Sequence, residues 1–104
     1  MPSLTVIYWR DIPAQVVAEE GRGRSRRQAK QELHRRFALA IDEAAMRDNA
    51  DSTDDYLAEW RKAEPEACGA DLEAEVAARV AQLEQAWPSE RLGKLVANGG
   101  FEEN

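Results

Sequence analysis

The chain has few of the residues from which catalytic and metal sites are usually built. Its 104 residues include one cysteine, Cys68, and one histidine, His34. A single cysteine excludes an intrachain disulfide and a thiolate cluster for zinc or iron. The acidic pairs Asp42-Glu43 and Asp54-Asp55 lack the spacing of a calcium-binding loop. The sequence therefore predicts neither a metal site nor a cofactor.

Long apolar runs and phosphate-binding motifs are also missing. No apolar run approaches the roughly 20 residues that a membrane helix needs. The opening MPSLTVIYWRD has neither the basic region nor the cleavage site of a signal peptide. The patterns GxxxxGK[ST] and GxGxxG do not occur. We therefore expect a cytoplasmic protein without a membrane partner.

What the sequence does contain is typical of a small globular domain. Hydrophobic residues make up 43% of the chain and charged residues 33%, which is enough apolar material for a modest core. A chain of this length normally forms one domain. We expect a single domain over residues 1–104, with an ordered core at about 4–97 and a tail at 98–104.

The first half of the chain predicts two strands and a long helix. LTVIYW, residues 4–9, is a β-rich run that we expect to be buried on both faces. Pro13 breaks this run, and a second strand follows around residues 15–18. Ser25 and Gln28 have the spacing of a capping box. They predict a helix from Ser25 to about Asp48, with Leu33, Phe37 and Ile41 along its apolar stripe.

The second half predicts a further strand and two helices. Tyr56–Arg61 fits either a strand or a short helix, and we favour the strand. The apolar spacing after Asp71 predicts a helix that ends at Trp87-Pro88, then a short helix that Asn98-Gly99-Gly100 terminates. The order β-β-α-β-α-α predicts an α+β fold, with a small three-stranded antiparallel or mixed sheet and helices packed on one face. Its two free edges make a homodimer one of the alternatives.

Charge is unevenly distributed along the chain. The formal net charge is -6, yet residues 22–36 hold seven of the 14 basic side chains beside one acid, Glu32. Residues 42–75 carry twelve acids and three bases. An overall pI near 4.8 and the lack of aromatic residues between the arginines disfavour nucleic acid as a partner.

The basic cluster has three interpretations. On a helix N-terminus, arginines would be disfavoured by the helix dipole, so an anionic small ligand held by the first turn is one. A protein partner with complementary charge is another. The third is a solvated cluster that balances a neighbouring acidic surface. The residues concerned are Arg22, Arg24, Arg26, Arg27 and Lys30.

Two tryptophan-arginine pairs are further candidates for partner contacts. Trp9 precedes Arg10, and Trp60 precedes Arg61; exposed Trp and Arg side chains are enriched at interface hot spots. Core packing is the competing explanation for both tryptophans, because a small domain needs large side chains to fill it. If their strands are neighbours, Trp9 and Trp60 form one apolar patch.

Neither His34 nor Cys68 predicts catalysis. His34 lies beside arginines in a predicted helix, where a histidine is typically a surface residue. Cys68 lies in a predicted loop before a helix, whose dipole would lower the thiol pKa. A reactive thiol and an ordinary loop residue both fit that position.

Three segments resemble a small bacterial family described as "virulence factor", related to a domain of larger conserved virulence factor proteins. The segments are LTVIYWRDIPAQVVAE, RRQAKQELHRRFALAIDEAAMR and DDYLAEWRKAEPEACG. The resemblance runs from about Leu4 to Val96 and implies no catalytic residues. It also implies a link to one-carbon and corrinoid-dependent methyl transfer. We expect a non-enzymatic protein-interaction or accessory domain, with a small-ligand module for a phosphorylated or carboxylated metabolite as the alternative.

Overall fold

The chain forms an antiparallel sheet with helices, an α+β fold as expected. The computed structural model describes residues 2–21, 26–47 and 53–101. Four strands lie in the order β3-β2-β1-β4. The short β5 pairs with the start of β1, whereas β4 pairs with its end. The strands are β1 (Ser3–Trp9), β2 (Ile12–Glu20), β3 (Arg27–Glu32), β4 (Trp60–Lys62) and β5 (Glu66–Ala67). The predicted sheet had too few strands.

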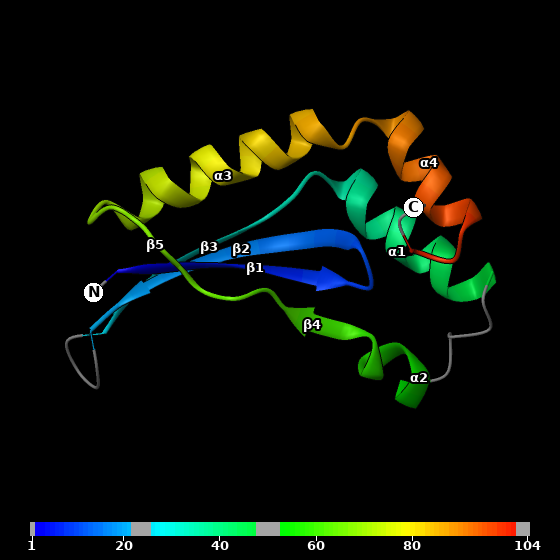
Figure 1. Cartoon of the computed structure of the whole chain (residues 1–104), viewed down its shortest axis with the longest axis horizontal. Helices are drawn as coiled ribbons and strands as arrows, with labels where there is room; N and C mark the ends of the chain where they lie inside the picture. The colour runs from blue at the N-terminus through cyan, green and yellow to red at the C-terminus, as the bar shows by residue number, and fades with distance from the viewer. Residues whose placement is uncertain (1, 22–25, 48–52, 102–104) are drawn as a thin grey trace.

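The helices lie mainly on one side of the sheet (Figure 1). They are α1 (Arg35–Arg47), α2 (Thr53–Ala58), α3 (Leu72–Ala86) and α4 (Ser89–Ala97). The long helix α3 runs over β2 and β3, while α1 and α4 pack against each other at one end of the sheet. The short α2 lies on the opposite side at that same end (Figure 1).

The core fills the space between the sheet and the helices above it. On β1 and β2, Leu4, Val6 and Val16 are at most 3% exposed. They face the apolar stripe of α3, which includes Val76 and Val80. Thr5, Ile7 and Val17 alternate with these residues and are only half-buried. The expectation that the first strand is buried on both faces is therefore wrong for the face away from α3.

The largest correction concerns residues 25–34, where the capping-box pattern predicted the start of a helix. Ser25 lies outside the described residues. Arg27–Glu32 form β3, which pairs antiparallel with β2 from Glu20↔Arg27 to Gln15↔Glu32. Gly21, at φ 89°, directs the chain out of β2 in a conformation that suits glycine. The helix begins only at Arg35, because ladder hydrogen bonds to β2 stabilise the extended conformation of the polar residues before it.

The ambiguous Tyr56–Arg61 segment contains both structures. Thr53–Ala58 is the helix α2, so the favoured strand is wrong for Tyr56 and its neighbours. Trp60–Lys62 is the strand β4, and Trp60 pairs directly with Trp9 of β1. The prediction that the two tryptophans lie on neighbouring strands is confirmed.

The C-terminal helices follow the sequence pattern closely. The Asp71 carboxylate accepts a hydrogen bond from the Ala74 N–H at 3.2 Å and caps α3. Pro88 is the N-cap of α4, and Gly99 and Gly100 follow it with φ 71° and 93°. The Gly100 carbonyl then accepts a hydrogen bond from the Asp11 N–H, which ties this end of the chain to the β1–β2 turn.

Candidate functional site: the open face of the sheet

The side of the sheet away from α3 carries a hollow of about 610 Å³. Its floor is formed by the half-buried Thr5, Ile7 and Val17, which alternate with the core residues of β1 and β2. Polar side chains from the outer strands surround this apolar floor. The hollow is lined by Thr5, Ile7, Gln15, Val17, Glu19, Arg26, Gln28, Lys30, Lys62, Ala63, Glu64 and Pro65. We call it the open face.

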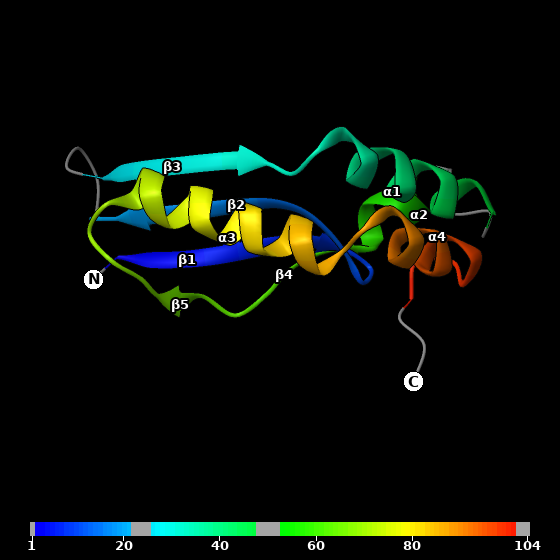
Figure 2. The same cartoon turned by 90° about the horizontal axis from the view of Figure 1, so that it is seen from above.

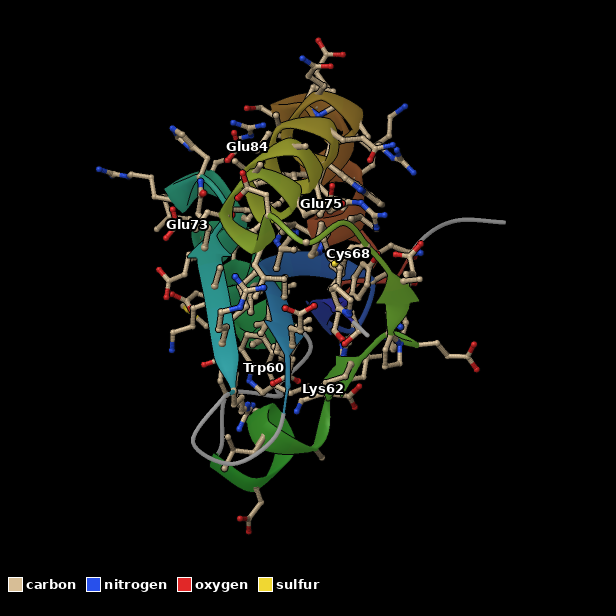
Figure 3. All side chains as sticks on the ribbon, turned by 90° about the vertical axis from the view of Figure 1, so that its left-hand side faces the viewer. Trp60, Lys62, Cys68, Glu73, Glu75 and Glu84 are labelled. Atoms are coloured by element: carbon tan, nitrogen blue, oxygen red, sulfur yellow. The ribbon has the colours of Figure 1, made fainter. Side chains whose placement is uncertain are left out.

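The open face has a small net positive charge, because Lys30, Lys62 and Arg26 stand against Glu19 and Glu64. Arg26 is paired with Glu19, with Nε 3.0 Å from Oε2, so these two charges offset each other. Lys30 enters the open face from β3 and Lys62 from β4, on opposite sides of the apolar floor. Figure 3 shows Lys62 on the side of the sheet away from α3. Neither lysine forms an ion pair within the described part of the chain.

The described arginines of the basic cluster lie around a strand, not on a helix N-terminus. Arg27 projects to the α3 side, where it pairs with Glu20 and donates a hydrogen bond to the Ala70 carbonyl at 3.3 Å. Arg22 and Arg24 lie outside the described residues. Because Arg27–Glu32 form a strand, the helix start that the anion-site interpretation required is wrong for these residues.

Trp9 and Arg10 make their contacts inside the protein. Trp9 is fully buried, and its indole N–H donates a hydrogen bond to the Tyr56 carbonyl at 2.9 Å. Arg10 is 7% exposed and forms an ion pair with Glu59, with Nε 3.3 Å from Oε2. The core interpretation therefore describes Trp9, and neither residue lies on the open face.

Trp60 and Arg61 extend from β4 in different environments. Trp60 packs edge-on against Tyr56, with ring centroids 5.8 Å apart. Both line a second cavity, of about 330 Å³, between α1, α2 and the sheet. Burial and the Asp42 carboxylate raise the pKa of Tyr56, and a hydrogen bond from Trp60 opposes them. Arg61 donates a hydrogen bond to the Arg10 carbonyl at 2.8 Å and thereby secures the β1–β2 turn.

Comparison with known proteins assigns the chain to a family. The model of the family described as "Virulence factor" matches residues 7–96, which is most of the chain. The chain belongs to the virulence factor family. Searches of the curated proteins and of the solved structures found no match. The matched region contains the whole open face except Thr5, so this surface belongs to the virulence factor domain itself.

The single cysteine of this virulence factor domain is not poised as a nucleophile. Cys68 is half-buried at the end of β5. Burial, together with the carboxylates of Glu75 and Glu20, raises the pKa of its thiol. Figure 3 shows Cys68 and Glu75 at this end of α3. The predicted lowering by the helix dipole is therefore wrong in direction.

His34 has a structural contact at the start of α1. Its Nδ1 accepts a hydrogen bond from the backbone N–H of Arg36 at 3.1 Å. The backbone N–H of His34 donates a hydrogen bond to the Glu84 carboxylate at 2.7 Å. The His34 side chain thus caps α1, and the His34 backbone N–H links the start of that helix to Glu84 of α3. Across the described residues, no group of three or more His, Cys, Asp and Glu side chains is placed to hold a metal ion. Within the same residues, no helix combines the length and apolarity needed to cross a membrane.

Sequence reasoning missed the central residues of the open face. Ile7 was expected in a strand buried on both faces, Val17 was placed in the second strand without a role, and Lys62 was not singled out. The missed signal was the alternation in Gln15-Val16-Val17-Ala18-Glu19, in which polar residues flank Val17 on its own face. That pattern is typical of a strand with one solvent-exposed face.

Proposed function

We propose that this virulence factor domain is a non-catalytic protein-interaction module that binds an acidic segment of a partner protein on its open face. The observation that carries the proposal is a sheet face with a half-buried apolar floor between two lysines, Lys30 and Lys62. An apolar centre with a charged rim is the usual anatomy of a protein interface. The lysines supply complementarity to carboxylates, which favours an acidic partner.

The shape of the open face favours a macromolecule over a small ligand. The hollow lies on the outer face of the sheet and its lining is spread across β1, β2, β3 and β4, whereas small-molecule sites enclose most of the ligand surface. The alternative was a metabolite held at an arginine-rich helix start. It has less support, because Arg27–Glu32 form the strand β3 and not the start of a helix. The family resemblance implies a link to one-carbon and corrinoid-dependent methyl transfer, and we attribute this link to the proposed partner.

A photo-crosslinking amino acid at Val17 tests the proposal in the native cytoplasm. We expect a discrete cross-linked partner from Val17 and none from Gln82, an exposed control position on α3. Replacing both lysines by glutamate should abolish the product, whereas Lys94→Glu on α4 should not. The same cross-linking pattern from Val17 and Gln82 would contradict the proposal.

A thermal shift assay separates the two classes of partner. Ligands that bind the folded state raise its melting temperature, and the increase grows with the logarithm of ligand concentration above Kd. We expect folates, corrinoids and nucleotides to leave the melting temperature unchanged. A concentration-dependent increase that Lys30→Glu and Lys62→Glu remove would favour a small anionic ligand on the same surface.

A further inference from the structure

The strand β3 ends the sheet on one side with an edge that can accept another strand. Within the described residues, β3 pairs only with β2. Figure 2 shows β3 along the margin of the sheet. The helix α3 lies over β2 and β3. Five of the six side chains of β3 are charged or amide-bearing, and all five are exposed; the sixth is the half-buried Ala29. An edge of this kind presents a row of backbone donors and acceptors.

The pairing with β2 determines which backbone groups point outward. The Leu33 N–H donates to the Ala14 carbonyl at 3.1 Å. In an antiparallel ladder, hydrogen-bonded and non-hydrogen-bonded pairs alternate, so Arg27, Ala29 and Gln31 bond to β2. Gln28 and Lys30 therefore turn their N–H and C=O groups toward the open edge.

We propose that two copies of this chain associate through their β3 strands, antiparallel, with the twofold axis at Ala29. In this register Gln28 of one copy faces Lys30 of the other, and their outward backbone groups exchange hydrogen bonds. Arg26 then lies opposite Glu32 of the second copy. The two sheets become one continuous sheet whose open faces lie on the same side.

The side chains favour this register over its neighbours. Opposite charges across strands stabilise a pair and like charges destabilise it; the Ala29 register places Arg26 against Glu32 twice and no like charges directly opposite each other. An axis at Lys30 would place the two lysines face to face. An axis at Gln31 would pair Lys30 with Glu32 but would leave the first half of β3 beyond the end of its partner.

The face toward α3 also accepts the pairing. There the two Ala29 side chains meet at the axis, and each Arg27 lies opposite Gln31 of the other copy. Ala29 is half-buried and is the smallest side chain of β3. The pair at the axis therefore adds little bulk beneath the two α3 helices.

A cysteine at the axis tests the register directly. Residues in a non-hydrogen-bonded antiparallel pair have Cα atoms about 4.5 Å apart, within the range of about 4.4–6.8 Å that a disulfide spans. In a Cys68→Ser background, we expect Ala29→Cys to form a disulfide-linked dimer under mild oxidation. Lys30→Cys, which would face Gln28, and Gln85→Cys on α3 are the controls. Cross-linking of Ala29→Cys no faster than the controls would overturn the proposal.

Sedimentation at increasing concentration gives an independent readout without a cross-link. Lys30→Pro removes an N–H that points outward, so the ladder with β2 remains intact. We expect this variant to fold and to dimerise about tenfold or more weakly, because the symmetric interface loses the hydrogen bond twice. A wild-type chain that stays monomeric, or a dimer that Lys30→Pro leaves unchanged, would contradict the inference. Val17 lies on β2, away from the edge, so cross-linking from it reports on the proposed partner independently.

Discussion

Arg10 is the buried charged side chain of the described core, and its removal should strongly destabilise the fold. It forms an ion pair with Glu59, and a guanidinium nitrogen donates to the Gly99 carbonyl. The guanidinium also lies 4.7 Å from the ring centroids of both Trp9 and Phe101. One side chain therefore connects the β1–β2 turn, the start of β4 and the C-terminal end of the chain.

We expect Arg10→Ala to lower the free energy of unfolding by about 2–4 kcal/mol. Breaking a fully buried ion pair costs about 3–5 kcal/mol, because the remaining charge stays desolvated. The Glu59 side chain is 35% exposed, so water compensates it in part and the lower range applies. Arg10→Lys should lose about half as much, because an ammonium keeps the charge but not the planar stacking between two rings.

Urea denaturation followed by tryptophan fluorescence measures this loss, since Trp9 is buried beside Arg10. Arg47→Ala is the matched control. Arg47 pairs with Glu43 on the exposed surface of α1 at 3.5 Å, and such i,i+4 pairs contribute about 0.3–0.5 kcal/mol. If Arg10→Ala and Arg47→Ala destabilise the chain equally, the guanidinium does not hold these segments together and the reasoning fails.

Three further predictions concern single positions. Asp71→Ala should lower the free energy of unfolding by about 1 kcal/mol in the same urea assay, because the Ala74 N–H loses its cap. Gly100→Ala should cost about 1–3 kcal/mol, since φ is +93° and a Cβ would lie 3.1 Å from Cζ3 of Trp9; unchanged stability would refute the assigned conformation. The Cys68 thiol should alkylate at pH 7 more slowly than a free cysteine, because its raised pKa leaves less thiolate; faster labelling would contradict this.

The elements that the sequence predicted well are those whose signals are local. The Asp71 cap, the apolar spacing through Val76 and Val80, and the glycines after α4 act within a few residues of one another. The same holds for β1, whose run of β-branched and aromatic residues is typical of a strand in any fold. Local signals of this strength also located the C-terminal half of α1.

The prediction failed at β3 because long-range pairing outweighs a local preference there. The segment Arg27–Glu32 is RQAKQE, which has good helix formers and no apolar alternation. It is extended because β2 offers a complete ladder from Glu20 to Gln15. An edge strand needs little apolar surface, so composition does not reveal it. The anion-site interpretation depended on the same error, because it required a helix N-terminus at this position.

Within the described part of the basic cluster, Arg26 and Arg27 form ion pairs and Lys30 does not. Glu19 and Glu20 end β2, and the return of the chain as β3 brings Arg26 and Arg27 against them. These two arginines balance neighbouring acids, as the plainest interpretation of the cluster proposed. Lys30 lies on β3 and lines the open face, across the apolar floor from Lys62, which comes from a segment remote in sequence. The surface proposed for a partner therefore depends on strand order, which a count of charges along the chain does not contain.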